Sequence, residues 1–110
     1  MDAVTISVNS AGVITAFDPG TADLLGHRAA DVLGRPMAEV VIPEPLRQPH
    51  EDGMARFLRT REPFLIGRTV EITALHADGS VIPVELSLRI ASEDPLVITG
   101  VLRRTGTSAP

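Results

Sequence analysis

Apolar and polar residues alternate near both ends of the chain, and a period of two predicts half-buried β-strands. The first two strands flank the turn residues of 9–12 and should form a hairpin. Later in the chain, a strand over 64–75 is followed by an Asp-Gly turn and by the strand with the clearest alternation, 82–90. A last strand spans 96–102. The alternating positions are Val4, Ile6, Val8, Val13, Thr15, Phe17, Val70, Ile72, Ala74, Ile82, Val84, Leu86, Leu88 and Ile90.

The middle of the chain has a helical period instead. Short turns over 19–42 are each too short to be stable without packing on a sheet. A longer helix is predicted to begin at Pro49 or His50, because proline in the first helical position costs no hydrogen bond. On this helix His50, Met54 and Leu58 recur at i, i+4 and i+8, so they share one face.

This order of elements predicts an α+β domain with an antiparallel sheet that helices cover on one face. The length of 110 residues is that of one domain. We expect the domain to span 1–104, because 105–110 is small and polar and is typical of a linker or frayed end. Aromatic residues make up only 3% of the chain, all of them Phe, so the core and any binding pocket should be aliphatic.

Charge and composition exclude several classes of protein. The net charge is -4, and the ten basic residues are all Arg and are dispersed, which argues against a nucleic-acid partner. The chain has no Cys, so it has no disulfide and no thiolate chemistry. It has neither a basic, apolar leader nor a run of the ~20 apolar residues that span a bilayer. These features predict a cytoplasmic domain that does not insert into a membrane.

A series of short motifs lies along the chain in a fixed order. The most specific is the turn 76–80 with the strand that follows it, and a second marks the last strand. The motifs are Asn9-Ser10-Ala11-Gly12-Val13-Ile14, Leu25-Gly26-His27, Asp31-Val32-Leu33-Gly34-Arg35-Pro36, Val41-Ile42-Pro43, Arg56-Phe57-Leu58-Arg59-Thr60, His76-Ala77-Asp78-Gly79-Ser80, Pro83-Val84-Glu85-Leu86-Ser87-Leu88 and Thr99-Gly100-Val101-Leu102-Arg103. In this order and spacing they resemble the PAS sensory domain family over nearly the whole chain.

The resemblance implies a five-stranded antiparallel sheet of order 2-1-5-4-3, with a pocket between its concave face and the helices. Such domains sense a ligand or partner and relay the change to an attached effector, such as a histidine kinase of a two-component system or a cyclase. They commonly form homodimers and are not themselves enzymes. One departure is that Arg104-Thr105-Gly106 stands where members often carry an Asp-Ile-Thr motif, which weakens the expectation of signal output at that junction.

The predicted pocket lies around the longer helix and the inner faces of the later strands. The run from Pro43 to Arg47, followed by His50 and Arg56, looks like the haem-binding oxygen-sensing subgroup, in which His50 would be the proximal iron ligand. Many PAS domains without haem share this pattern, so a structural role for His50 stays open. The absent Cys excludes flavin-cysteinyl chemistry. The expected binding residues are His50, Met54, Arg56, Leu58, Leu65, Arg68, Leu86, Leu88 and Ile98.

Three functional hypotheses follow. The first is a sensory module that binds a small ligand or a partner in the pocket, the second is a haem-based gas sensor, and the third is a ligand-free dimerisation or scaffolding domain with a filled core. For dimerisation we expect the outer sheet face and flanking segments to be used. The other two histidines, His27 and His76, lie at a helix end and in a turn, where exposure is expected. The outer apolar patch is predicted to contain Ile14, Ala16, Val81, Val97 and Val101.

Overall fold

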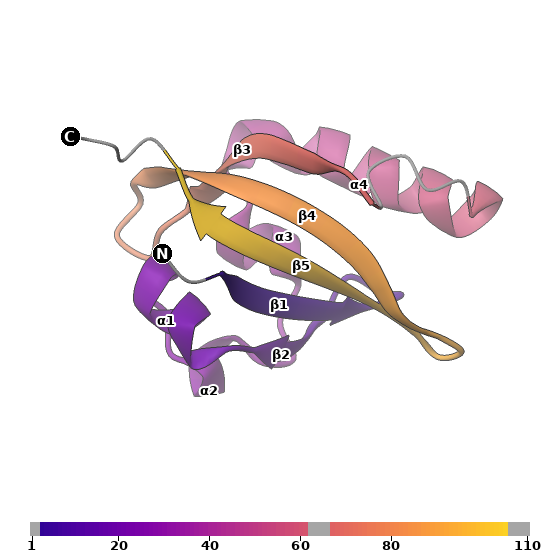
Figure 1. The fold of residues 1–110 in the computed structure, drawn as a ribbon, viewed down its shortest axis with the longest axis horizontal. Coiled ribbons are helices and arrows are strands. Elements are labelled where there is room, and N and C mark those ends of the chain that lie inside the picture. The colour runs from indigo at the N-terminus through magenta and orange to yellow at the C-terminus, as the bar shows by residue number, and fades with distance from the viewer. Residues whose placement is uncertain (1–2, 62–66, 106–110) are drawn as a thin grey trace.

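A five-stranded antiparallel sheet forms the centre of the computed structural model, which describes residues 3–61 and 67–105. Its strand order is β2-β1-β5-β4-β3, as predicted. The last strand lies between the first and the fourth, so the two ends of the chain meet in the middle of the sheet (Figure 1). The strands are β1 (Val4–Asn9), β2 (Ile14–Phe17), β3 (Thr69–Leu75), β4 (Val81–Glu93) and β5 (Leu96–Arg104).

The described residues between β2 and β3 form four helices, and α3 and α4 lie behind the sheet in Figure 1. They are α1 (Pro19–Leu25), α2 (Ala29–Val32), α3 (Met37–Val41) and α4 (Glu44–Thr60). The ends of α1 follow the sequence closely. Asp18 accepts a hydrogen bond from the Gly20 amide at 3.0 Å, and Gly26 ends the helix in the left-handed conformation with φ 79°.

The core is mostly aliphatic, as the composition predicted, and Phe17 and Phe57 are its aromatic members among the described residues. Each strand contributes alternate residues to the inner face, and α1, α2 and α3 contribute the residues that close it. Leu25, Val32 and Val84 have no exposed surface. The buried apolar residues are Val4, Ile6, Val8, Ile14, Phe17, Leu25, Val32, Val40, Val41, Phe57, Ala74, Ile82, Val84, Leu96, Ile98 and Leu102.

The predicted alternation of the second strand is wrong. The pairing of β1 with β2 shifts between Ser7 and Val8, so Val8 pairs with Ile14 while Ser7 pairs with Ala16. This irregularity puts Ile14 on the inner face, where only 1% of it is exposed. Ile14 therefore belongs to the core and not to the outer apolar patch.

The longest helix begins earlier than predicted. α4 starts at Glu44 and contains Pro49 in its interior. Pro45 lies in the first turn of α4, where the backbone amide needs no hydrogen-bond partner. The preference for proline in the first helical turn, which had suggested Pro49, therefore applies to Pro45. The third strand starts at Thr69, and the predicted start at Phe64 lies outside the described residues.

Candidate functional site

The helices differ in how many residues they bury in the core. α4 has 17 residues but buries only Phe57, whereas the shorter α1 and α3 each bury two residues. A further set of apolar side chains on α4, β3 and β4 packs against the core and stays only half-buried. This half-buried apolar set consists of Met54, Leu58, Ile72, Leu86, Leu88 and Ile90. Apolar surface therefore remains accessible on the inner side of the fold, on the elements that the sequence predicted would form the pocket.

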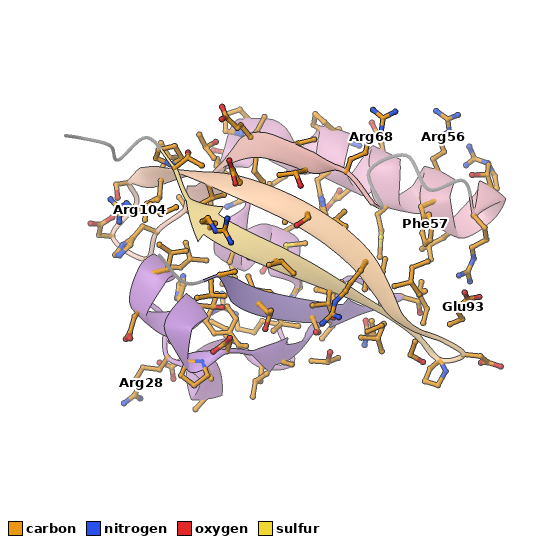
Figure 2. All side chains as sticks on the ribbon, viewed as in Figure 1. Arg28, Arg56, Phe57, Arg68, Glu93 and Arg104 are labelled. Carbon is orange, nitrogen blue, oxygen red and sulfur yellow. The ribbon has the colours of Figure 1, made fainter. Side chains whose placement is uncertain are left out.

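Phe57 fixes the C-terminal half of α4 to the core. Its ring points from the helix toward the sheet in Figure 2, and only 9% of the residue is exposed. The Arg61 guanidinium lies 5.6 Å from the ring centroid, and the Arg61 amide donates to the Phe57 carbonyl at 2.7 Å. Arg61 ends the helix in a left-handed conformation, so these contacts also define where α4 stops.

Arg47 fixes the N-terminal half of α4 to α3. Its Nε donates to the carbonyl oxygens of Ala38 and Ile42, each at 3.0 Å, and a terminal nitrogen lies 3.5 Å from the Glu39 carbonyl oxygen. These are carbonyls at the C-terminal end of α3, which otherwise lack helical partners. A cation at this end of a helix is also electrostatically favourable. Arg47 belongs to the sequence pattern from Pro43 to Arg47, but only the structure shows that it anchors α4 to α3.

His50 lies between these two anchors and is half-buried. Burial lowers the pKa of its imidazole below the ordinary value of 6.5, and the nearby Glu51 carboxylate opposes this effect. The ring is therefore neutral at pH 7, when one nitrogen can accept a hydrogen bond or ligate a metal. His50 shares its helix face with Met54 and Leu58, as predicted.

Apart from His50, the predicted binding residues fall into four groups. Met54, Leu58, Leu86 and Leu88 are members of the half-buried apolar set, while Ile98 is buried on the inner face. The two arginines among the predicted binding residues, Arg56 and Arg68, are exposed and point away from the sheet in Figure 2. The ninth predicted residue, Leu65, lies outside the described residues.

The two other histidines are not exposed, so that prediction is wrong. His76 packs against Gly26, where a Cβ atom would lie 2.5 Å from the imidazole Cε1. The next residue, Ala77, donates its amide to the Leu25 carbonyl at 2.8 Å, so the β3–β4 turn is held on the end of α1. The His27 Nε2 atom is buried and has no hydrogen-bond partner among residues 3–61 and 67–105.

Neither a metal cluster nor a membrane-spanning helix is found in the described part of the chain. No group of three or more His, Cys, Asp or Glu residues among 3–61 and 67–105 is arranged to hold a metal ion. Over the same residues, no helix is long and apolar enough to cross a bilayer. A single haem ligand is not covered by the first observation, because haem iron needs only one such side chain.

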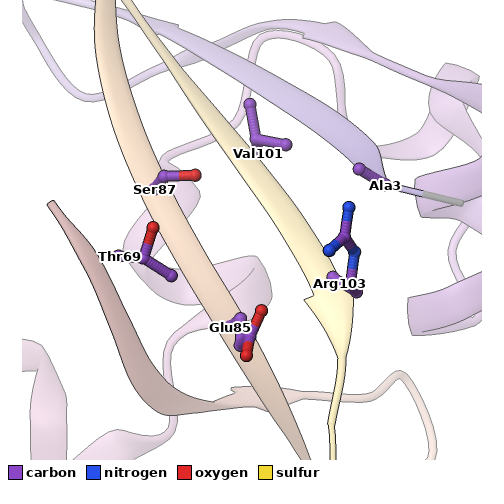
Figure 3. Close-up of a pocket in the computed structure, with 6 residues that line it drawn as sticks. All are labelled: Ala3, Thr69, Glu85, Ser87, Val101 and Arg103. Atoms are coloured by element: carbon purple, nitrogen blue, oxygen red, sulfur yellow. The ribbon is translucent and has the colours of Figure 1, made fainter. Parts of the chain in front are cut away.

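A hollow of about 230 Å³ lies on the opposite, outer face of the sheet. Figure 3 shows it over β3, β4 and β5, with Glu85 and Arg103 at one end and Val101 and Ser87 at the other. Glu85 pairs with both Glu71 of β3 and Arg103 of β5 in the sheet register. The lining residues are Ala3, Thr69, Glu85, Ser87, Val101 and Arg103.

The fold is that of an α+β domain with helices on one face of the sheet, and comparison with known proteins gives the family. The chain belongs to the PAS domain family, whose model matches residues 1–103. A protein of Azorhizobium caulinodans described as uncharacterized is 41% identical over 88 residues, which is 80% of this chain and 12% of that protein. The sensor protein FixL of Bradyrhizobium diazoefficiens is 28% identical over 83 residues, which is 76% of this chain and 16% of FixL.

Solved PAS domains share the whole architecture. The PAS domain of the quorum-sensing receptor RpfR from Cronobacter turicensis, in complex with C12:0, has a TM-score of 0.73 at 11% identity, with 96% of each chain covered. The resemblance at this identity concerns the fold. The chain spans less than one fifth of the length of the curated relatives described above, so those proteins contain much more than this domain.

Proposed function

We propose that this PAS domain senses a small ligand that binds against the half-buried apolar set on α4, β3 and β4. The observation that carries the proposal is that the longest helix buries only Phe57, while six apolar residues facing the core keep accessible surface. Apolar surface left uncovered on the inner side of a small domain is typical of a ligand site. A ligand that covers it would stabilise one arrangement of α4 against the sheet and so shift the population toward it.

The chemistry of the set favours a ligand with an alkyl body. Its side chains are Leu, Ile and Met, without an aromatic ring to stack on a planar cofactor. Burial of each methylene group is worth about 0.8 kcal/mol, so a flexible chain can gain affinity from these walls alone. The RpfR PAS domain, which has the same fold, was solved in complex with C12:0. Dodecanoate is therefore a suitable first probe for this domain.

Calorimetric titration with dodecanoate tests the proposal. We expect saturable 1:1 binding by the wild-type domain and at least fivefold weaker binding by Leu58→Ala, because Leu58 belongs to the half-buried set. Leu46→Ala is the matched control, since Leu46 lies on the same helix and is 42% exposed. Absence of binding by the wild type, or an equal loss in both variants, would refute an alkyl ligand at this position.

His50 favours haem as a second candidate ligand. It is half-buried, and burial keeps the imidazole neutral at pH 7, which is the form that ligates iron. His50 would hold a haem bound there, the haem would supply an iron centre for gas binding, and the aliphatic residues of the half-buried apolar set would line the site. The exposed Arg56 and Arg68 point away from this region, which gives no support to their expected part in holding the group.

An absorption spectrum after reconstitution with haem separates this candidate from the first. A Soret band in the wild type that shifts or disappears in His50→Ala supports ligation by His50. A band that is unchanged in the variant, or absent from both proteins, removes His50 as the iron ligand. The dodecanoate titration is unaffected by either result.

We further propose that the domain passes its signal to an attached effector and to a second copy, and has no catalytic activity of its own. Support for an effector comes from the small share of the sensor protein FixL that this domain matches. Support for a second copy comes from the outer sheet face, where the hollow over β3, β4 and β5 places the uncharged Ser87 and Val101 beside the charged Glu85 and Arg103. The third hypothesis, a ligand-free scaffold, requires the dodecanoate and haem experiments both to be negative.

A further inference from the structure

Gly100 lies on the inner face of the sheet, in the middle of β5. It is buried, and its register partners are Leu88 of β4 and Ile6 of β1. Its neighbours on the same face of β5 are Ile98 and Leu102, which are large and buried. Gly100 is therefore a position without a side chain at the centre of an otherwise filled aliphatic surface.

The backbone at Gly100 does not require glycine. Its φ lies outside the left-handed region, unlike that of Gly26 or Gly79. A glycine inside a strand also weakens it, because glycine loses more conformational entropy on folding and offers no side chain for packing. The residue at this position is therefore limited by the room for a side chain on the inner face and not by the backbone conformation.

Two leucines of the neighbouring strand occupy that space. A Cβ atom on Gly100 would lie 3.2 Å from Cδ1 of Leu86 and 3.5 Å from Cδ2 of Leu88. Both leucines belong to the half-buried apolar set, so each has one side over Gly100 and another side accessible. The contacts are made by the ends of flexible side chains, which can change rotamer without movement of the sheet.

We propose that Gly100 is the floor of the ligand site and determines the length of alkyl chain that the domain accepts. Leu86 and Leu88 cover this floor in the ligand-free domain and rotate away from it when a long chain enters. A short chain occupies only the space beside the leucines and leaves the floor covered. This inference rests on the proposed alkyl ligand, and it assigns selectivity to a residue that has no side chain.

Paired titrations with octanoate and dodecanoate test the role of Gly100. Gly100→Val fills the floor, so we expect its affinity for dodecanoate to fall at least tenfold while its affinity for octanoate changes less than threefold. Gly100→Ala requires Leu86 to move by only a few tenths of an ångström, so it keeps the fold and should give an intermediate change in the ratio of the two affinities. Gly53→Ala is the matched control, because Gly53 is exposed and an added Cβ there meets nothing within 4 Å.

Methyl resonances of Leu86 and Leu88 give a second reading. Dodecanoate should shift both sets of methyl signals in the wild type, whereas octanoate should leave those directed at Gly100 unchanged. If the wild type binds both acids and Gly100→Ala and Gly100→Val keep the wild-type ratio, the floor is refuted and the ligand site stands. If the wild type binds neither acid, both proposals are refuted.

Discussion

At the scale of single residues, the contact between His76 and Gly26 should be among the most sensitive points of the fold. Gly26 has φ 79°, and an added Cβ would lie 2.5 Å from the imidazole of His76. We expect Gly26→Ala to lower the free energy of unfolding by roughly 2–4 kcal/mol, of which about 1–2 is backbone strain and the rest is the clash. Urea unfolding followed by circular dichroism measures the change.

Gly12→Ala is the control that separates strain from clash. Gly12 has φ 76°, nearly the same as Gly26, but nothing lies within 4 Å of an added Cβ. It should therefore lose only the strain contribution. Adding His76→Ala to Gly26→Ala should recover part of the loss, because the clashing ring is then absent. Equal losses for the two glycines would show that His76 does not press on Gly26.

His50 should make the stability of the domain depend on pH. Burial lowers its pKa in the folded state below the value of 6.5, so near that pH the unfolded chain binds more protons than the folded one. The free energy of unfolding therefore falls as the pH drops through 6.5 toward the lower folded pKa. We expect the loss between pH 7.5 and 5 to be smaller in His50→Gln than in the wild type, as measured by urea unfolding at both pH values. A loss of the same size in both proteins would contradict this assignment.

Residue types predicted some of these roles and missed others. The capping roles of Asp18 and Gly26 depend only on residues within a few positions in the sequence, so residue type alone is enough to suggest them. The environment of His76 depends on a helix end about fifty residues away, so a local pattern could indicate only a turn. Gly100 was visible in a strand, where an isolated glycine signals close approach, but only the positions of Leu86 and Leu88 say what approaches it.

At the scale of elements, α3 and α4 should depend on Arg47 for their relative position. Its Nε donates to the carbonyl oxygens of Ala38 and Ile42, and a terminal nitrogen lies near the Glu39 carbonyl oxygen, a set of donors that only a guanidinium supplies. We expect Arg47→Met to keep the aliphatic stem and lose about 1–3 kcal/mol of stability through the unpaired carbonyls. Urea unfolding measures the loss, and hydrogen exchange should show faster opening of α3 and the first turns of α4.

Arg59→Met provides the comparison on the same helix. Arg59 is exposed in the last turn of α4, so its replacement should change the stability by less than about 0.5 kcal/mol. Arg47→Lys should behave more like Arg47→Met than like the wild type, since an ammonium group cannot reproduce the Nε contacts. Wild-type exchange rates for α3 in Arg47→Met would show that packing alone holds the two helices together.

The elements themselves were largely predictable, and their errors have local causes. Alternation over 82–90 and the Asp78-Gly79 turn gave β3, β4 and their hairpin correctly. The prediction of which β2 residues face inward was wrong, because β1 and β2 shift register next to Val8 and a four-residue strand is too short to reveal such a shift in its sequence. The predicted start of α4 was wrong because Pro45 and Pro49 both fit the first turn of a helix. Contacts between Arg47 and α3 stabilise the earlier start.

At the scale of the whole molecule, the sheet separates two surfaces with different chemistry. The inner side carries the half-buried apolar set, and the outer side carries the hollow lined by small and charged residues. Because β4 and β5 contribute alternate residues to both sides, a ligand that moves Leu86 or Leu88 acts on the strand that also carries Ser87. For the proposed ligand and the proposed second copy, this connection would be a physical path between the two sites, and the oligomeric state would then be a measurable output.

The outer face has a charge pattern that suits pairing with a second copy. One uncharged row crosses the sheet at Ser87 and Val101, and it lies between a row with Glu85 and a row with Arg89. A two-fold axis along the uncharged row would place Glu85 of each copy opposite Arg89 of the other. The small residues of the uncharged row would then allow the two sheets to approach closely.

Val101→Arg tests this arrangement, because it puts a cation in the middle of the uncharged row. We expect the wild-type domain to sediment as a dimer at micromolar concentration and Val101→Arg to sediment as a monomer with an unchanged unfolding midpoint. A charge-reversed pair gives the more specific result: Glu85→Arg alone should weaken the dimer, and combining it with Arg89→Glu should restore it, since each copy then supplies the opposite charge again. A wild-type monomer up to 100-fold higher concentration, or a dimer that survives Val101→Arg, would place the interface elsewhere.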